Sequence, residues 1–298
     1  MLFHHVELHR FYDKWVSEDF SYSRVRGLGS MPCKLYGLFR VPSLQPLQLR
    51  FAAVAFALSV VTSCYPPLSR FGCWGAFATY HFYFPQLFAS RIVGGHTTIL
   101  LPAVFFICGC CPANKDWSLV LLRIYIASGY CSSGLEKIRS SVKLSSFWGR
   151  GETLQFYIFE SMWMRRHPAT LAPIATALQR WFVTRTRLLT LMATTVLIVE
   201  STAPFSLLSD TAALWFGVSL LGFHVGAAFL QQLDFISFWA AALLAFLVPV
   251  GRSPWEALVH GFADPMFAPA VAYTLGQIMC VLLRTDRYLP LSCVPMFK

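Results

Sequence analysis

The chain has 298 residues, of which 56% are hydrophobic and 13% are charged, whereas an ordinary soluble domain has roughly a quarter of its residues charged. Its 27 Phe and 9 Trp, with a mean hydropathy of +0.55, exceed what one water-soluble core can bury. The composition therefore predicts an integral membrane protein. It excludes a disordered chain and a disulfide scaffold, and the net charge of +10 is expected to mark one membrane face rather than a nucleic-acid surface.

Apolar runs organise most of the chain. Residues 1–50 are mixed in polarity and interrupted by Gly and Pro, so they predict an N-terminal tail and lead-in. Runs near the roughly 20 residues that a membrane-spanning helix needs then recur over 51–284, and 285–298 form a short C-terminal tail. The runs are 51–65, 72–90, 97–113, 117–136, 188–208, 211–230, 233–250 and 266–283. They predict an all-α, polytopic integral membrane helical bundle of about eight spans.

Two further segments, between the fourth and fifth runs, predict interfacial amphipathic helices. In ETLQFYIFESMWM (152–164), Leu154, Ile158 and Met162 recur at helical spacing beside charged positions. We expect this helix to lie at the interface or to re-enter the membrane. The second segment, PATLAPIATALQRWFVTRTR (168–187), ends in a dense group of arginines and is expected to lie on the same surface.

The distribution of basic residues predicts the topology. If each run crosses once, most of the basic residues fall on one face: the basic N-terminal region, Arg91, the clusters 137–150 and 165–187, Arg284 and Arg287. The other face is then close to neutral, since it receives Arg70, Lys115, Asp116, Asp210, Arg252, Glu256 and Asp264. Both termini are expected on the basic, cytosolic face, which requires 150–187 to cross twice or not at all.

Ionisable side chains inside apolar runs are costly, so each is a candidate functional group. Glu200 is prominent because it lies in the middle of TTVLIVESTAPFSLL, shortly before a proline that frees a backbone carbonyl. The alternative for each group is a snorkelling side chain or a buried ion pair, such as Arg123 with Glu200. The candidates are His81, Arg123, Glu136, Lys137, Glu200, His224 and Asp234.

Motifs of metal and soluble-type catalysis are lacking. The eight His are scattered, and only His5 and His9 have an i, i+4 relation, so no metal site is expected. Phosphate-binding glycine loops and a G-x-S-x-G elbow are absent. The nine Cys are interpreted as small buried residues, and a disulfide such as Cys33 to Cys64 stays open.

Three segments carry a family resemblance. They are RIYIASGYCSSGLEKIRSSVKLSSFWGRGETL, VLIVESTAPFSLL and GFHVGAAFLQQLDFISFWAAAL. In this order they resemble the HTTM domain, the transmembrane domain of the vitamin K-dependent gamma-carboxylase family, over about residues 45–285. The positions that match are Gly134, Lys137, Trp148 and Gly151 in the first segment, Glu200 and Pro204 in the second, and His224 and Phe235 in the third.

The resemblance implies an enzyme core in which a lysine, here Lys137, deprotonates reduced vitamin K. The quinol is then oxygenated to its epoxide while a substrate glutamate is carboxylated. The implied cofactor is therefore reduced vitamin K or another quinone. Two features depart from the pattern, namely an insertion between Lys137 and Trp148 and the lack of the large extramembrane domain that positions a protein substrate. In addition, Glu136 next to Lys137 is a charge that could keep this lysine protonated.

The sequence is compatible with two main functions. The first is a divergent membrane enzyme acting on a lipophilic, quinone-like or lipid substrate, with Lys137 as base and Glu200, His224 and Arg123 in a polar pocket. It requires Lys137, Glu200 and His224 to converge on one cavity, and Lys137→Ala should abolish activity in a folded protein. The second is a non-catalytic membrane scaffold or subunit of a larger complex; a transporter ranks third. Expected partners are membrane lipid, a lipophilic small molecule and other membrane proteins, but not nucleic acid.

Overall fold

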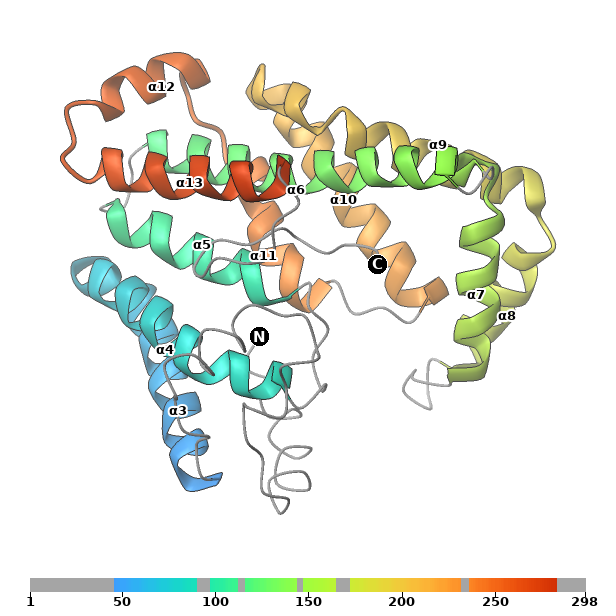
Figure 1. Cartoon of the computed structure of the whole chain (residues 1–298), viewed down its shortest axis with the longest axis horizontal. Helices are drawn as coiled ribbons and strands as arrows, with labels where there is room; N and C mark the ends of the chain where they lie inside the picture. The colour runs from blue at the N-terminus through green and yellow to red at the C-terminus, as the bar shows by residue number, and fades with distance from the viewer. Residues whose placement is uncertain are drawn as a thin grey trace. The chain divides into compact units, whose positions relative to one another are not determined.

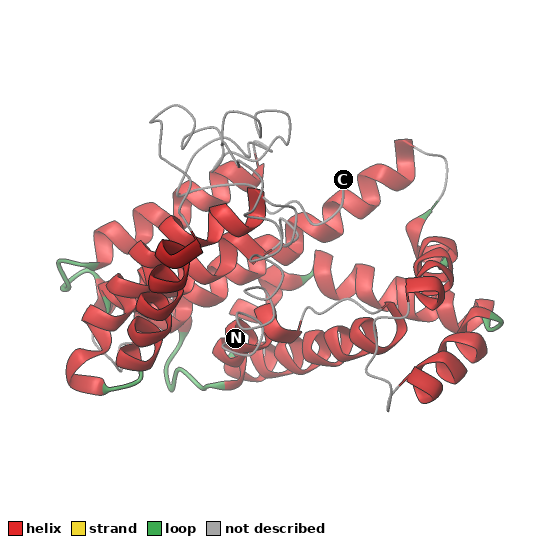
Figure 2. Ribbon diagram, turned by 90° about the horizontal axis from the view of Figure 1, so that it is seen from below, coloured by secondary structure: helices red, strands yellow, loops and turns green. Residues whose placement is uncertain are grey.

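The structure is a computed structural model that describes residues 46–89, 97–111, 116–143, 147–164, 172–231 and 236–282. All secondary structure in these ranges is helical, and Figure 2 shows only helices and loops there. The predicted all-α class is therefore confirmed. Both predicted tails lie outside the described residues, apart from the end of the N-terminal lead-in, where the first of the described helices begins at Pro46.

Each of the eight predicted apolar runs overlaps a helix in the described residues (Figure 1). These helices are α3 (Pro46–Ser63), α4 (Ser69–Ala89), α5 (Thr97–Cys110), α6 (Asp116–Lys143), α9 (Thr186–Ser201), α10 (Asp210–Gln231), α11 (Ile236–Leu247) and α13 (Phe267–Leu282). Two of them, α3 and α9, are followed by turns that contain Pro66 and Pro204.

Shorter elements connect these helices. The two predicted amphipathic segments are helical as α7 (Glu152–Met164) and α8 (Ala172–Val183). An additional helix, α12 (Pro254–Gly261), starts at a capping box in which Ser253 and Glu256 satisfy each other's backbone N–H. Short 3-10 turns complete the order: η2 (Pro66–Leu68), η3 (Trp148–Arg150) and η4 (Ala203–Leu207).

Two of the described helices are long and apolar enough to cross a membrane. They are Asp116–Ser141 of α6 and Asp210–Gln231, which is α10. The number rises to four if each of two bent pairs forms one span, α3 with α4 (bent by 120°) and α8 with α9 (bent by 97°). These helices support the prediction that the chain is a membrane protein.

The described helices group into two compact units. Unit 1 contains the residues up to Tyr125 and those from Val250 onward, and unit 2 contains Ile126–Pro249. Aromatic side chains of α3, α4, α5 and α13 interdigitate in unit 1. Phe56 contacts Tyr80 and Phe105 with ring centroids 5.8 Å away in each case, and Phe106 stacks on Tyr273 at 4.4 Å.

Unit 2 is built around α9 and α10. Leu154 and Ile158 of α7, Leu189 and Ala193 of α9 and Leu230 of α10 form a buried cluster. Helices α10 and α11 also pack closely, because a Cβ atom on Gly217 would lie 2.8 Å from the Cβ of Phe246. This unit holds most of the candidate site residues.

Candidate functional site

A buried ion pair joins α6 to α9 in unit 2. Lys137 Nζ donates to Glu200 Oε2, and both side chains are almost completely buried, at 3% and 2% exposure. Lys137 Nζ also donates to Ser133 Oγ at 2.9 Å, and Ser133 Oγ donates to Glu200 Oε2 at 3.2 Å. The hydroxyl completes a closed triangle of hydrogen bonds, so the two buried charges compensate each other at a site without bulk water.

The close approach of α6 and α9 depends on Gly134. A Cβ atom at this position would lie 2.6 Å from Ser201 Oγ and 2.7 Å from the Ser201 backbone nitrogen. Only a residue without a side chain lets the two helix backbones approach this closely, as small residues do in membrane helix pairs. Gly134 thereby sets the distance that brings Lys137 to Glu200.

The segment 148–151 packs against α9 nearer the N-terminus of that helix. Gly151 has a φ of 81°, which favours glycine, and its Cβ would lie 2.6 Å from the backbone carbon of Leu189. Thr190 and Thr194 of α9 donate to the carbonyls of Arg150 and Gly149 at 2.8 and 3.1 Å. The two patterned glycines, Gly134 and Gly151, therefore both permit contact with α9.

Trp148 and Pro204 complete the surroundings of the pair. The Lys137 ammonium lies 5.1 Å from the centroid of the Trp148 ring, within the range of a cation–π interaction. The Trp148 backbone N–H donates to Ser141 Oγ of α6 at 2.8 Å. Pro204 lies in the first turn of η4, directly after the end of α9, where a proline needs no N–H partner.

His224 belongs to a neighbouring buried pair. Its Nε2 forms a 2.5 Å hydrogen bond with the hydroxyl of Tyr130, and both side chains are buried. Tyr130 lies seven residues before Lys137 on α6, on the same helix face. One face of α6 thus carries two buried polar contacts, one to α9 and one to α10.

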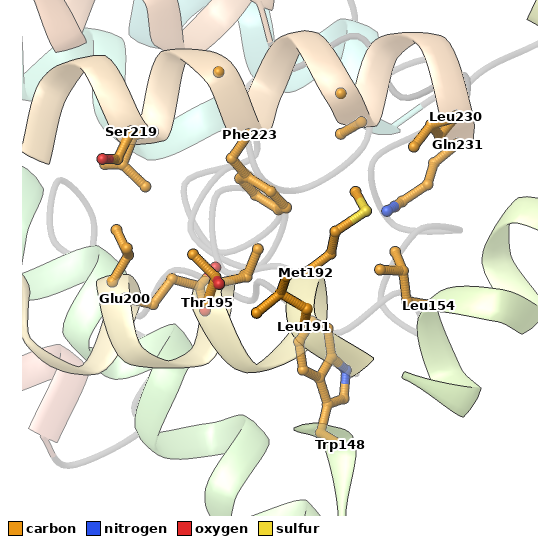
Figure 3. A pocket seen from close by; sticks show the side chains of 16 residues that line it. Trp148, Leu154, Leu191, Met192, Thr195, Glu200, Ser219, Phe223, Leu230 and Gln231 are labelled. Atoms are coloured by element: carbon orange, nitrogen blue, oxygen red, sulfur yellow. The ribbon is translucent and has the colours of Figure 1, made fainter. Parts of the chain in front are cut away.

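An apolar cavity of about 340 Å³ lies between α9 and α10 (Figure 3). Phe223 points from α10 toward α9, and Met192 extends into the same space from α9. Glu200 supplies a carboxylate to the lining and Trp148 a ring. The described residues that line the cavity include neither Lys137, His224 nor Arg123, so Lys137 reaches it only through Glu200 and Trp148.

The cavity opens on the exposed side of unit 2. Leu191 and Thr195 of α9 and Ser219 and Gly222 of α10 line it and are themselves exposed. Because α10 is long and apolar enough to span a membrane, its exposed side faces lipid when the helix is inserted. A molecule dissolved in the membrane would then enter sideways between the two helices.

The predicted site residues are brought together in part. Lys137 and Glu200 are in contact, and His224 lies beside them through Tyr130. The carboxylate that pairs with Lys137 is that of Glu200. We had considered Glu136, which precedes Lys137 in the sequence, but successive residues of a helix point in different directions. Arg123 is buried on the part of α6 that belongs to unit 1, so its place in a polar pocket stays a prediction.

Other candidates carry less structural information. Asp234 and Phe235 fall outside the described residues, as do His5, His9 and Cys33. His81 lies on α4, and its side chain is not described. Sequence reasoning missed Ser133 and Tyr130, although their positions four and seven residues before Lys137 place them on its helix face.

Protein-family models, characterised proteins and solved structures were each compared with this chain, and none of them matches it.

Proposed function

We propose that this chain is a multi-pass membrane protein of HTTM type that binds a lipophilic molecule between α9 and α10. The bound molecule would be quinone-like or a lipid, and the chain would act on it as a divergent membrane enzyme. The observation that carries this proposal is the arrangement of one buried carboxylate, paired with a buried lysine, at an apolar cavity with an exposed mouth. We also propose about eight crossings, one for each apolar run, with both termini on the basic, cytosolic face.

The shape and lining of the cavity favour an apolar ligand with one polar end. Its volume of about 340 Å³ falls in the roughly 300–1,000 Å³ range of small-molecule sites. Leu191, Val196 and Phe223 present apolar surface, whereas Glu200 offers a hydrogen-bond acceptor. A ring or chain that ends in a hydroxyl would satisfy both parts of the lining.

The ion pair would handle the proton of such a hydroxyl. Glu200 is the member that faces the cavity, and Lys137 lies behind it. A hydroxyl that donates to the Glu200 carboxylate would pass its proton to the pair, and Lys137 would compensate the charge that changes. In this proposal the proton acceptor is the pair, rather than Lys137 alone as the family resemblance implies.

A second candidate is the non-catalytic scaffold or subunit of a larger membrane complex. The groove of about 630 Å³ in unit 1 favours it, because its lining is almost entirely apolar and includes Trp255 and Phe262. These two side chains are 73% and 77% exposed. Exposed aromatic surface of this kind is typical of contacts with other membrane proteins or with lipid. On this view the Lys137–Glu200 pair only fixes α6 to α9.

Filling the cavity separates the two candidates. A Cβ atom on Gly226 meets no atom within 4 Å, so Gly226→Phe is tolerated by the backbone and places a ring in the cavity. We expect the wild-type protein, purified in mild detergent, to retain a defined lipophilic molecule at about one per chain. Gly226→Phe should reduce this amount at least roughly tenfold, since a ring of this size occupies much of the available space. Mass spectrometry of the organic extract measures the amount of this molecule retained by the wild-type protein and by Gly226→Phe.

The matched control is Val225→Phe on the neighbouring position of α10. Val225 is 40% exposed and does not line the cavity, so a phenylalanine ring is introduced on another face of the same helix. This variant should retain the molecule as the wild type does. Bulk lipid alone in all three proteins, or equal loss in both variants, would contradict the proposed cavity function and favour the scaffold.

A further inference from the structure

Helix α8 meets α9 at an angle that orients it with respect to a membrane. The two helices are separated only by Thr184 and Arg185 and are bent by 97°. Helix α9 lies beside α10, which has the length and composition of a span. If α9 enters the membrane along its normal, a helix at nearly a right angle to it lies in the plane of the surface.

The side chains of α8 divide into three faces. Ala175 and Gln179 are fully buried against the protein, and the Gln179 amide donates to Ser161 Oγ and to the Leu230 carbonyl, each at 3.0 Å. Ile174, Leu178 and Trp181 form an apolar stripe that is 58%, 40% and 46% exposed. Arg180 is exposed on the third side.

These faces point in directions that suit an interface. With 3.6 residues per turn, the buried face, the apolar stripe and Arg180 lie roughly 120° apart around the helix axis. One side can therefore rest on the protein, a second can enter the acyl-chain region and the third can point to water. This distribution is typical of helices that lie in the membrane interface.

Positive charge accumulates where α8 turns into α9. Arg180, Arg185 and Arg187 are all exposed, and the Arg185 guanidinium lies 5.3 Å from the centroid of the Trp181 ring. The sequence contains no Asp or Glu between Glu160 and Glu200. Nothing acidic within this stretch of chain therefore neutralises the arginines, which favours an anionic partner.

We propose that the turn between α8 and α9 is a binding site for the headgroup of an anionic phospholipid. Arg180, Arg185 and Arg187 contact the phosphate, and the stripe of Ile174, Leu178 and Trp181 packs on the acyl chains. Guanidinium groups suit this role because they bind phosphate oxygens in a bidentate manner. The site is separate from the cavity between α9 and α10 and does not depend on what that cavity binds.

The alternative geometry, in which α8 and α9 form one broken span, is disfavoured by the same residues. The bend would then lie within the hydrocarbon region, and three arginines cluster at it. Each arginine at the centre of a bilayer costs about 2.5–3.5 kcal/mol or more. Placement of the bend at the interface removes this cost and satisfies the guanidinium groups with lipid phosphates.

The experiment compares the wild-type protein with the variant R185Q/R187Q. Each delipidated protein is added to micelles that contain equal amounts of phosphatidylglycerol and phosphatidylcholine, and native mass spectrometry counts the lipids retained. We expect the wild type to prefer phosphatidylglycerol, and the variant to lose roughly tenfold or more of this preference. Glycerophosphoglycerol, which is the headgroup without acyl chains, should not compete, because the apolar stripe contributes to binding.

A matched control removes two basic residues elsewhere. Arg70 and Lys115 fall on the opposite predicted face, so R70Q/K115Q changes the net charge equally and should keep the preference. The proposal is overturned if R185Q/R187Q retains the preference, or if both variants lose it to the same extent. Competition by the free headgroup would instead identify a site for a soluble phosphate compound and would also overturn it. Thermal unfolding of each variant verifies that the fold is intact.

Discussion

Lys137→Ala is expected to destabilise the protein by about 3–5 kcal/mol, because it removes one partner of a buried ion pair. The Glu200 side chain is 2% exposed, and its remaining hydrogen-bond donor among the described contacts is Ser133. A carboxylate left in this environment loses its solvation without gaining a counter-ion. The loss of stability is measured by unfolding the purified protein in mild detergent with heat or denaturant.

The control replaces both charges together. K137M/E200L keeps a similar volume at each position and leaves no buried charge, so its stability should return close to that of the wild type. Since this double variant is expected to fold, it also separates structure from function. Under the proposed enzyme its bound molecule stays chemically unchanged, whereas the wild type converts it. Equal stability of Lys137→Ala and wild type would show that the pair is not desolvated as described.

The expected loss of stability in Lys137→Ala differs from what the sequence alone predicts for this variant. Lys137 in isolation looks like a base at the end of an apolar run, so its removal is expected to affect activity and not folding. The structure pairs it with Glu200, which lies 63 residues further along the chain. Loss of activity in Lys137→Ala would then report unfolding as well as chemistry, and only the double variant separates the two.

The helices were predictable from local information. A run of apolar residues long enough to cross hydrocarbon favours a helix whatever the rest of the chain does, because each backbone N–H must find a partner inside the segment. Each of the eight runs contains a helix, although only two of the described helices are long and apolar enough to cross a membrane on their own. Helix α12 escaped prediction, because it occupies a polar break and begins at the capping box of Ser253 and Glu256.

The pairing of the charges was not predictable in the same way. We considered Arg123 as a partner of Glu200, whereas the structure pairs Glu200 with Lys137; hydropathy says nothing about which helices become neighbours. The information that selects Lys137 lies in Gly134, one turn earlier, which allows α6 to approach Ser201 next to Glu200. A small residue one turn from a buried charge was thus a usable signal, but it identifies the partner helix only after the packing is known.

The sequence contains an even weaker indication of the cavity between α9 and α10. Gly222 and Gly226 of α10 leave open space, since a Cβ atom on either meets nothing within 4 Å. In sequence they are indistinguishable from Gly217, where a Cβ would press on Phe246. Whether a helical glycine creates a contact or a cavity is decided by the neighbouring helix, which the sequence of α10 does not contain.

Gly151→Ala is the second substitution with a large expected effect, about 2–5 kcal/mol of lost stability. Two costs add at this position. An L-residue in the left-handed region costs roughly 1–2 kcal/mol, and the φ of Gly151 is 81°. The new Cβ would also lie 2.6 Å from the backbone carbon of Leu189, and overpacking of this kind costs about 1–3 kcal/mol.

Gly251→Ala separates these two costs. Gly251 has a similar φ of 76°, but its Cβ would meet no atom within 4 Å. Its substitution should therefore cost only the conformational part, roughly 1–2 kcal/mol. The difference between the two variants in unfolding free energy reports the contact between the 148–151 segment and α9. Equal losses would mean that the segment does not press on α9. A larger loss at Gly151 should be accompanied by weaker retention of the lipophilic molecule, because Trp148 of the same segment lines the cavity.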